Sequence, residues 1–376
     1  MADVAPVWDR FAHWPRGRAL VALALTLALL ILSALAPIRA GEGDTAGPPS
    51  LTGKSDQANR PARDEDLALY DRVIERLQRG ENYYDAVAIE HRRSHYPLNP
   101  GLAVRLPTLA VAEAWVPLPG QVAASILLLL GVLAAWWRRL DEEPGGKDVR
   151  MLGMAGVFVG CSILTFRYFF VLHELWAGGL LALAFGLHRP DRGKWLGAWI
   201  AAALALSIRE HALPFVLLMG AFAAWHRRWK EAAAWAALVL IFVAALAWHL
   251  HIVAGLIRPD DAHGPSWITL RGLGGWLSMI VLSSNLRLLP HFIAGSLVVL
   301  MMLGWAGWRS SAGSFGTLLQ LGYGLAFMIA GRGDNWYWGM VVAPSLFIGL
   351  AFLPHVVPSL WRAAFPSGAV QPRYTG

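Results

Sequence analysis

Three consecutive acidic residues, Asp64, Glu65 and Asp66, precede a helical pattern and are the first candidates for chemistry. A positioned carboxylate can act as a general base for a hydroxyl group. Asp64 and Asp66 together can also bind a divalent cation, Mg²⁺ or Mn²⁺, through oxygen ligands. The structural alternative is that acidic residues at a helix N-terminus cap its backbone N–H groups and interact favourably with its dipole. The acidic triplet therefore predicts either a catalytic carboxylate or a helix cap.

A segment rich in basic and aromatic side chains follows in the sequence. Its candidate binding residues are Tyr83, Tyr84, His91, Arg92, Arg93 and His95. Pro97, Pro100 and Pro107 favour an extended, turning path after His91. Cationic groups on such a path suit the phosphate of a ligand at the membrane surface. The alternative is a solvated loop that contacts lipid headgroups.

Three further polar clusters lie at the ends of apolar stretches. They are His173 with Glu174; Arg209 with Glu210 and His211; and Arg332 with Asp334, Asn335 and Tyr337. A charge beside hydrocarbon is costly, so it faces a cavity or an oppositely charged partner. Arg167 and Glu174, for example, are two helical turns apart and can pair on one face. Each cluster alone can be an interfacial ion pair, but all three fall on one predicted side of the membrane, which favours a functional site.

The elements that position these groups are predicted to be membrane-spanning helices. Of the 376 residues, 56% are hydrophobic and 15% are charged, whereas a soluble domain carries about 25% charged residues. The chain has 19 Trp and 38 Gly, which is typical of membrane proteins. A single cysteine, Cys161, excludes a disulfide framework. The net charge of +7 comes from basic residues between apolar stretches, which indicates topology rather than a nucleic-acid partner.

Apolar stretches of helical length occur throughout the chain. They are residues 19–38, 119–137, 151–172, 175–188, 195–208, 212–225, 232–254, 286–308, 314–330 and 337–357. We expect an all-α polytopic bundle of about ten transmembrane spans, because a span needs about 20 apolar residues. Residues 1–376 would form a single membrane domain, and the first stretch is interpreted as an uncleaved anchor rather than a signal peptide. Basic residues are enriched in alternate connections, so both termini are predicted to be cytoplasmic in a bacterial plasma (inner) membrane.

The first extracytoplasmic loop is predicted over residues 39–118. Its first part, residues 41–63, is rich in Gly, Pro and polar residues and is interpreted as a linker. Apolar residues then recur at helical spacing from Leu67 to Leu77, which predicts an amphipathic helix over 65–79 that ends at Gly80. We expect this helix to lie on the membrane surface or against the bundle.

Taken together, these features resemble the GT-C superfamily of integral-membrane glycosyltransferases, which use polyprenyl-phosphate-linked sugars. The resemblance rests on the acidic pair before an amphipathic helix, the G-x-x-Y-Y motif at 80–84 and HRRSHYPLNP at 91–100. It continues in HELWAGGLLAL at 173–183, SIREHALP at 207–214 and GRGDNWYWGMVVAP at 331–344. It therefore extends over most of the chain as a pattern of topology and loose motifs.

The resemblance implies roles for the candidate residues at an extracytoplasmic active site. Asp64 or Asp66 would be the catalytic carboxylate, with Glu65 beside it, and a divalent cation held by Asp64 and Asp66 is possible chemistry. The donor phosphate would be bound by His91, Arg92, Arg93, Arg209 and Arg332. The substrates would also contact Tyr83, Tyr84, His95, His173, Glu174, Glu210, Asn335 and Tyr337. The expected partners are a polyprenyl-phosphate sugar donor, a glycan, lipid or protein acceptor, and the lipid bilayer.

Other functions are weighed against this hypothesis. A non-enzymatic transporter or flippase of a lipid-linked sugar would also place charges on cavity walls, but at mid-membrane depth and on both sides. An acyltransferase with His173 or His211 as its base stays open. A zinc metalloprotease is disfavoured because Ala177 stands where the second histidine of H-E-x-x-H is needed. No G-x-S-x-G motif supports a serine nucleophile.

Overall fold

The computed structural model describes residues 8–39 and 63–366 of the chain. Across these residues the fold is all-helical, with fifteen α-helices and short 3₁₀ segments. Extended pairing in the described ranges is limited to isolated bridges. The expected all-α class is therefore confirmed. The predicted linker at 41–63 lies, apart from Arg63, outside the described residues.

Among the residues that the structure describes, five helical segments are long and apolar enough to cross a membrane. They are α1 (Arg16–Leu35), α5 (Leu118–Glu142), α10 (Trp229–Leu256), α13 (Ser311–Ile329) and the run Ala343–Ala364, which joins α14 (Ala343–Leu346) to α15 (Leu353–Ala364). Their length reflects uninterrupted apolar sequence, as in α1, where the 20 residues include no acidic side chain. The coarse expectation of a membrane protein with several spanning helices is thus supported, and ten spans stay a prediction.

The other apolar helices are shorter. They are α6 (Arg150–Cys161), α7 (His173–Leu187), α8 (Leu196–Ile208), α9 (Leu213–Trp225), α11 (Gly272–Leu282) and α12 (His291–Gly307). Helix α11 is not among the stretches expected from the sequence, because its apolar run is only 11 residues long. Several of these helices begin or end next to polar residues. Helix α8 ends just before Arg209, whose backbone is extended, and α7 begins at His173. The helix breaks therefore carry the polar clusters noted in the sequence.

The acidic triplet and the basic segment belong to two helices beside the bundle, α2 (Glu65–Gln78) and α3 (Tyr83–Arg93). The helix predicted over 65–79 is confirmed as α2, and Gly80 adopts the positive φ of +86° needed to leave it. The extended path predicted after His91 starts later than expected. Asn82 caps α3, so His91, Arg92 and Arg93 form its last turn. The chain then loops to α4 (Pro107–Trp115).

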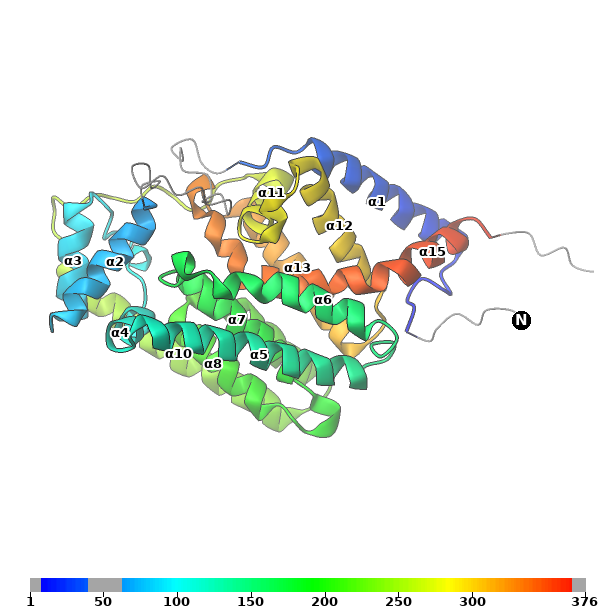
Figure 1. Ribbon diagram of the computed structural model, residues 1–376, viewed down its shortest axis with the longest axis horizontal. Helices are drawn as coiled ribbons and strands as arrows, with labels where there is room; N and C mark the ends of the chain where they lie inside the picture. The colour runs from blue at the N-terminus through cyan, green and yellow to red at the C-terminus, as the bar shows by residue number, and fades with distance from the viewer. Residues whose placement is uncertain (1–7, 40–62, 367–376) are drawn as a thin grey trace, which may run out of the picture.

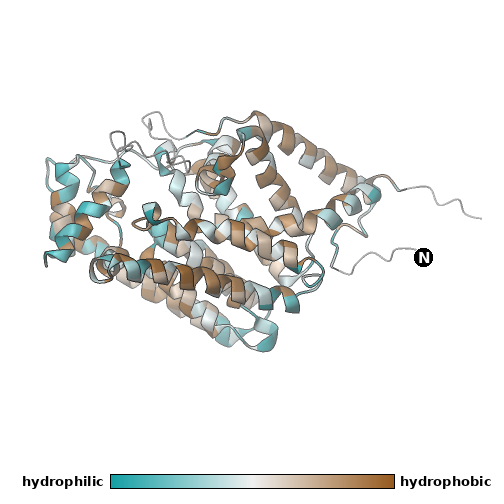
Figure 2. Cartoon of the chain, viewed as in Figure 1, coloured by the Kyte–Doolittle hydropathy of each residue, from teal (hydrophilic) through white to brown (hydrophobic). Residues whose placement is uncertain are grey.

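The bundle has two distinct ends, shown in Figure 1 with α2 and α3 at the left. At that end, Arg92 donates to the carbonyl of Leu256 at the end of α10 (2.7 Å). At the opposite end, the Trp308 indole donates to the carbonyl of Pro144 (2.8 Å), and Asp9 pairs with Trp308 in an isolated bridge. Figure 2 shows hydrophilic residues concentrated on α2 and α3 and in the turns at the opposite end, with hydrophobic helices between them.

Close backbone contacts set the position of the 3₁₀ segment Gly333–Val341, which carries Tyr337. This segment packs against α7 and α11. A Cβ at Gly178 of α7 would lie only 2.0 Å from the carbonyl oxygen of Met340, and one at Gly339 would lie 2.1 Å from that of Met279. Both glycines thus permit contacts that no larger residue allows. The residues around Tyr337 are buried and held in one place.

Candidate active site

A polar cavity of about 300 Å³ lies at the end of the bundle that α2 and α3 cover. Its walls come from α2, from the loop after α3, from the segment 264–267 and from the 3₁₀ segment Gly333–Val341. The predicted site residues that line it are Glu65, Asp66, His91, His95, Arg332, Asn335 and Tyr337. Three elements that are distant in sequence therefore bring seven of the predicted residues to one cavity.

Asp66 is held by two tyrosine hydroxyls. Tyr96 donates to Oδ1 (2.5 Å) and Tyr337 donates to Oδ2 (2.6 Å). Burial, followed by the charge of Asp66, raises the pKa of Tyr96 far above its usual value of 10.0, so this phenol stays protonated and donates. Two charge-assisted hydrogen bonds fix the orientation of the carboxylate in the cavity wall.

Asp64 has a different environment from Asp66. Its Oδ1 accepts from the backbone N–H groups of Asp66 (3.0 Å) and Leu67 (3.4 Å), so Asp64 is the N-cap of α2. This is the structural alternative considered for the triplet. Glu65 is exposed at the cavity rim. Of the three acidic residues, Asp66 is the one oriented toward the cavity by neighbouring side chains.

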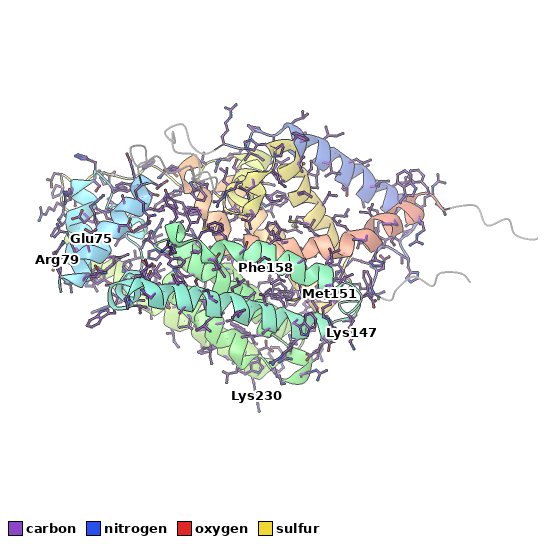
Figure 3. The ribbon with its side chains drawn as sticks, viewed as in Figure 1. Glu75, Arg79, Lys147, Met151, Phe158 and Lys230 are labelled. Atoms are coloured by element: carbon purple, nitrogen blue, oxygen red, sulfur yellow. The ribbon has the colours of Figure 1, made fainter. Side chains whose placement is uncertain are left out.

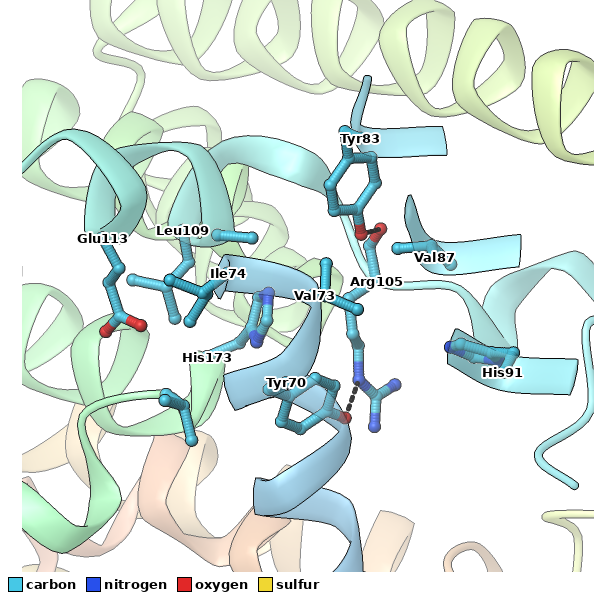
Figure 4. Close-up of a pocket in the computed structure, with 12 residues that line it drawn as sticks. Tyr70, Val73, Ile74, Tyr83, Val87, His91, Arg105, Leu109, Glu113 and His173 are labelled. Atoms are coloured by element: carbon cyan, nitrogen blue, oxygen red, sulfur yellow. Dashed lines mark hydrogen bonds between the residues drawn. The ribbon is translucent and has the colours of Figure 1, made fainter. Parts of the chain in front are cut away.

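Arg105 is a cation of the cavity wall that sequence analysis missed. Its Nε donates to the hydroxyl of Tyr70 on α2 (3.0 Å), and its carbonyl accepts from the hydroxyl of Tyr83 on α3 (2.6 Å). Figure 4 shows the guanidinium between Tyr70 and His91. Within 8–39 and 63–366, no carboxylate forms an ion pair with Arg105. A lone arginine between Val104 and Leu106 belongs to no motif, so only the fold reveals it.

Arg332 lies at the rim of the same cavity. It pairs with Asp334 (Nη2–Oδ2 2.9 Å), and its backbone N–H donates to Oδ1 of Asn335 (3.2 Å). Arg271 donates to the carbonyl of Arg332 (3.0 Å). The predicted residues Arg332 and Asn335 therefore form a local turn beside Tyr337, and part of the Arg332 charge is balanced by an exposed carboxylate.

His91 lines the cavity as a neutral ring. It is 5% exposed, and its Nδ1 lies 3.0 Å from the carbonyl oxygen of Pro97. Burial lowers the pKa of His91 from 6.5 to about 4, although the hydrogen bond to Pro97 acts in the opposite direction. The cationic role expected for His91 is therefore not supported near pH 7. His95 is exposed at the rim, in a left-handed conformation with φ of 57°.

Arg92 and Arg93 are not among the residues that line the cavity. Arg92 forms a bidentate pair with Asp261 (2.7 and 2.9 Å), which ties α3 to the segment after α10. The Arg92 pair holds the pKa of Asp261 near 2, below its usual 3.8. Arg93 is an exposed side chain 3.9 Å from Glu90. The structure thus gives Arg92 a structural partner in place of the phosphate expected from the sequence.

The second polar cluster is buried among the helix ends. Arg209 Nε lies 2.7 Å from Oε1 of Glu174, and Arg209 also pairs with Glu210. Glu174 therefore pairs with Arg209 rather than with Arg167 as expected, because the helix break after α8 carries Arg209 to the start of α7. Arg209 is 1% exposed and has two acidic partners, so its charge is already balanced.

The remaining predicted residues lie beside the cavity rather than in it. His173 packs edge-on against the ring of Tyr70 (centroids 5.5 Å) and, with Tyr83, lines a separate space of about 20 Å³ behind Arg105. Figure 4 shows these side chains around Arg105. Tyr84 contacts Nδ1 of His249 on α10 (3.1 Å). These residues support the cavity wall from behind.

The carboxylates of Asp64 and Asp66 already accept hydrogen bonds, and the divalent cation expected there stays a prediction. Both oxygens of Asp66 accept phenol hydrogen bonds, and Oδ1 of Asp64 accepts from two backbone N–H groups. In the described part of the chain, no three His, Cys, Asp or Glu side chains gather in the manner of metal ligands.

Searches of protein-family models, of curated proteins and of solved structures found no match to this chain. The cavity and its residues are therefore the features that bear on function.

Proposed function

We propose that this chain is an integral-membrane glycosyltransferase that moves a sugar from a polyprenyl-phosphate donor to a glycan, lipid or protein acceptor. One juxtaposition carries the proposal. Asp66, oriented by two phenols, and Arg105, which has no acidic partner among the described residues, line one polar cavity. A fixed base and a cation that forms no direct ion pair are two groups that suit transfer from a phosphate leaving group.

In this mechanism Asp66 accepts the proton of the acceptor hydroxyl. The hydroxyl oxygen forms a bond to the anomeric carbon, the bond from that carbon to the phosphate oxygen breaks, and polyprenyl phosphate leaves with the electron pair. Attack opposite the leaving group inverts the anomeric centre. Tyr96 and Tyr337 keep the carboxylate oriented, which lowers the reorganisation needed in the transition state.

Arg105 is the proposed partner of the donor phosphate. Its Nε is engaged by Tyr70, which leaves the two terminal nitrogens to donate in the planar pair that phosphate accepts. Arg332 at the rim is the second cation, and it shares its charge with Asp334. Trp267 and Asn335, which also line the cavity, offer a stacking surface and a polar group for the sugar.

The distribution of basic residues supports an extracytoplasmic cavity in a bacterial plasma membrane. Basic side chains occupy the short turns at the end opposite to α2 and α3, whereas many basic residues of the other end lie in the long segment 39–118, to which the positive-inside rule does not apply. Those opposite to α2 and α3 include Arg10, Lys147, Arg150, Arg189, Arg192, Arg228 and Arg309. Figure 3 marks Lys147 at that end and Glu75 and Arg79 of α2 at the other. Basic connections stay cytoplasmic, so the cavity would face outward.

The first and last described segments of the chain agree with this orientation. Trp8 packs against His355 of α15 (ring centroids 5.3 Å), and Arg309 donates through its backbone N–H to the carbonyl of Trp8 (2.7 Å). The start of α1 and the last helix thus meet at the basic end, which supports cytoplasmic positions for both termini.

The test compares Asp66→Asn with Asp64→Asn in purified, solubilised protein. Short-chain polyprenyl-phosphate hexoses and pentoses serve as donors, and release of polyprenyl phosphate is measured. Asp66→Asn should lower transfer by about 10²- to 10⁴-fold, because the base is lost. Asp64→Asn should retain transfer, since asparagine caps a helix as well as aspartate does.

The same experiment separates the transferase from a transporter of a lipid-linked sugar. In detergent there is no membrane to cross, so a transporter forms no product with any of these donors. If Asp66→Asn transfers sugar at the rate of the wild-type protein, Asp66 is not the base. If the wild-type protein transfers sugar from none of the donors, the result favours the transporter.

A further inference from the structure

A second, larger groove lies at the basic end of the bundle, opposite to the end that holds Asp66. It has a volume of about 630 Å³ and lies between the end of α9 and the start of α13. Its walls combine apolar side chains with a short polar edge. The apolar side includes Leu218, Phe222 and Leu318, and the polar side includes Ser310, Ser311 and Ser314.

The polar edge is held by an arginine from the N-terminal segment. Arg10 donates through Nη2 to Oγ of Ser314 (3.0 Å) and to the carbonyl of Trp308 (3.3 Å). Its backbone N–H donates to the carbonyl of Gly307 (3.0 Å). These bonds fix the guanidinium beside a residue of the groove wall.

Two more arginines stand near Arg10 with no carboxylate to balance them. Burial, and then the charges of Arg309 and Arg18, lower the pKa of Arg10. Arg309 is exposed and directly precedes Ser310, and Arg18 stacks over Trp14 (4.2 Å). Among the residues with described positions, none of the three forms an ion pair, and no acidic side chain lines the groove.

Aromatic side chains mark the level of the membrane interface at this groove. Trp225, a lining residue at the end of α9, is 85% exposed, and Trp229 at the start of α10 is 67% exposed. Tryptophan prefers the headgroup region of a bilayer. The groove therefore combines an apolar trough below this level with a polar edge that Arg10 contacts through Ser314 and that Arg309 directly precedes in the chain.

We infer that this groove binds an anionic phospholipid of the leaflet at the basic end. The acyl chains would lie along Leu218, Phe222 and Leu318, and the phosphate would accept from Arg10, Arg309 and the hydroxyl of Ser311. Charge complementarity selects this occupant, since a zwitterionic lipid brings a cation of its own to Arg10 and Arg309. The site is separate from the proposed catalytic cavity and does not depend on the transferase activity.

The test measures which lipids stay bound to the purified protein. Full-length protein in detergent is mixed with equal amounts of dioleoyl phosphatidylglycerol and dioleoyl phosphatidylcholine and examined by native mass spectrometry. Phosphatidylglycerol should be retained in preference. Arg10→Gln and Arg309→Gln should each lower the ratio of retained phosphatidylglycerol to phosphatidylcholine about five-fold, as expected for one basic residue near an anionic lipid.

Matched controls keep the test decisive. Arg192→Gln removes an exposed arginine from the same end, outside the groove lining, and should leave the ratio unchanged. Leu318→Trp fills the apolar trough and should lower phosphatidylglycerol retention although Arg10 and Arg309 are in place. Because Arg309 and Leu318 are exposed, both variants should fold normally.

Three results would overturn the inference. They are equal retention of the two lipids by wild-type protein, an unchanged ratio in Arg309→Gln, and displacement of the lipid by glycerol 3-phosphate at equal concentration. The last result would mean that the cations bind a free phosphate without the groove.

Discussion

Tyr337 donates its hydroxyl hydrogen to Oδ2 of Asp66 over 2.6 Å, although 271 positions separate the two residues. Tyr337 is 2% exposed and belongs to a segment packed against α7 and α11, whereas Asp66 starts the peripheral helix α2. This bond therefore joins the peripheral unit to the bundle at the proposed catalytic carboxylate.

Removing this donor should impair the orientation of Asp66. Tyr337→Phe should lower transfer by about 10- to 100-fold, the loss expected when one hydrogen bond to a charged group is removed. Steady-state kinetics of the purified variant would check this. Tyr84→Phe is the matched control, because Tyr84 bonds His249 outside the cavity and should keep near-normal transfer. Equal activities of the two variants would argue against a role for the Asp66–Tyr337 bond.

Arg105 and Arg92 should respond differently to the same substitution. Arg105→Gln should lower kcat/KM for the donor by about 10²-fold or more, because it removes the cation proposed to stabilise the leaving phosphate. Arg92→Gln should leave kcat/KM within a few-fold and lower thermal stability, since Arg92 pairs with Asp261. Kinetics and thermal unfolding of both variants distinguish these effects, and Arg105→Lys should recover part of the lost activity. Reversed behaviour would restore Arg92 as the phosphate ligand.

His91 should make the fold sensitive to mild acid. Its folded-state pKa, about 4, lies below the ordinary 6.5, so the folded state binds fewer protons than the unfolded state between these values. The contribution of neutral His91 to the free energy of unfolding is fully present above about pH 6.5 and is lost as the pH falls toward about 4. The midpoint of thermal unfolding, measured at a series of pH values, should therefore decrease as the pH is lowered from about 6.5 to about 4. His91→Gln should flatten the dependence there, and an unchanged slope would show that other groups cause it.

Cysteine labelling should report the two ends of the bundle separately. The native thiol, Cys161, is 0% exposed, so it should contribute little background. Glu65→Cys at the cavity rim should react with an impermeant maleimide added outside intact cells, and Lys147→Cys should react only after the cells are opened. Labelling of both positions from the same side would contradict the orientation and place the cavity residues with the basic connections.

Local sequence was sufficient for the features that depend on local physics. Charge scarcity and long apolar runs predicted a helical membrane protein, and apolar spacing predicted α2, because helix formation and membrane insertion follow from composition and period over neighbouring residues. The competing roles of Asp64 and Asp66 could not be separated in this way. One side chain caps its own helix and the other meets phenols from two distant segments, and only the folded chain shows that difference.

The tertiary structure alone decided which of the predicted charges are available. Arg92 and Arg209 match a phosphate-binding pattern as well as any residue here, yet the fold gives them Asp261 and Glu174 as partners. Arg105 belongs to no motif, yet it is the cation left without a carboxylate among the described residues of the cavity wall. A sequence reports which charges exist, whereas pairing depends on three-dimensional distances between residues far apart in the chain, and pairing determines whether a charge is free to act on a substrate.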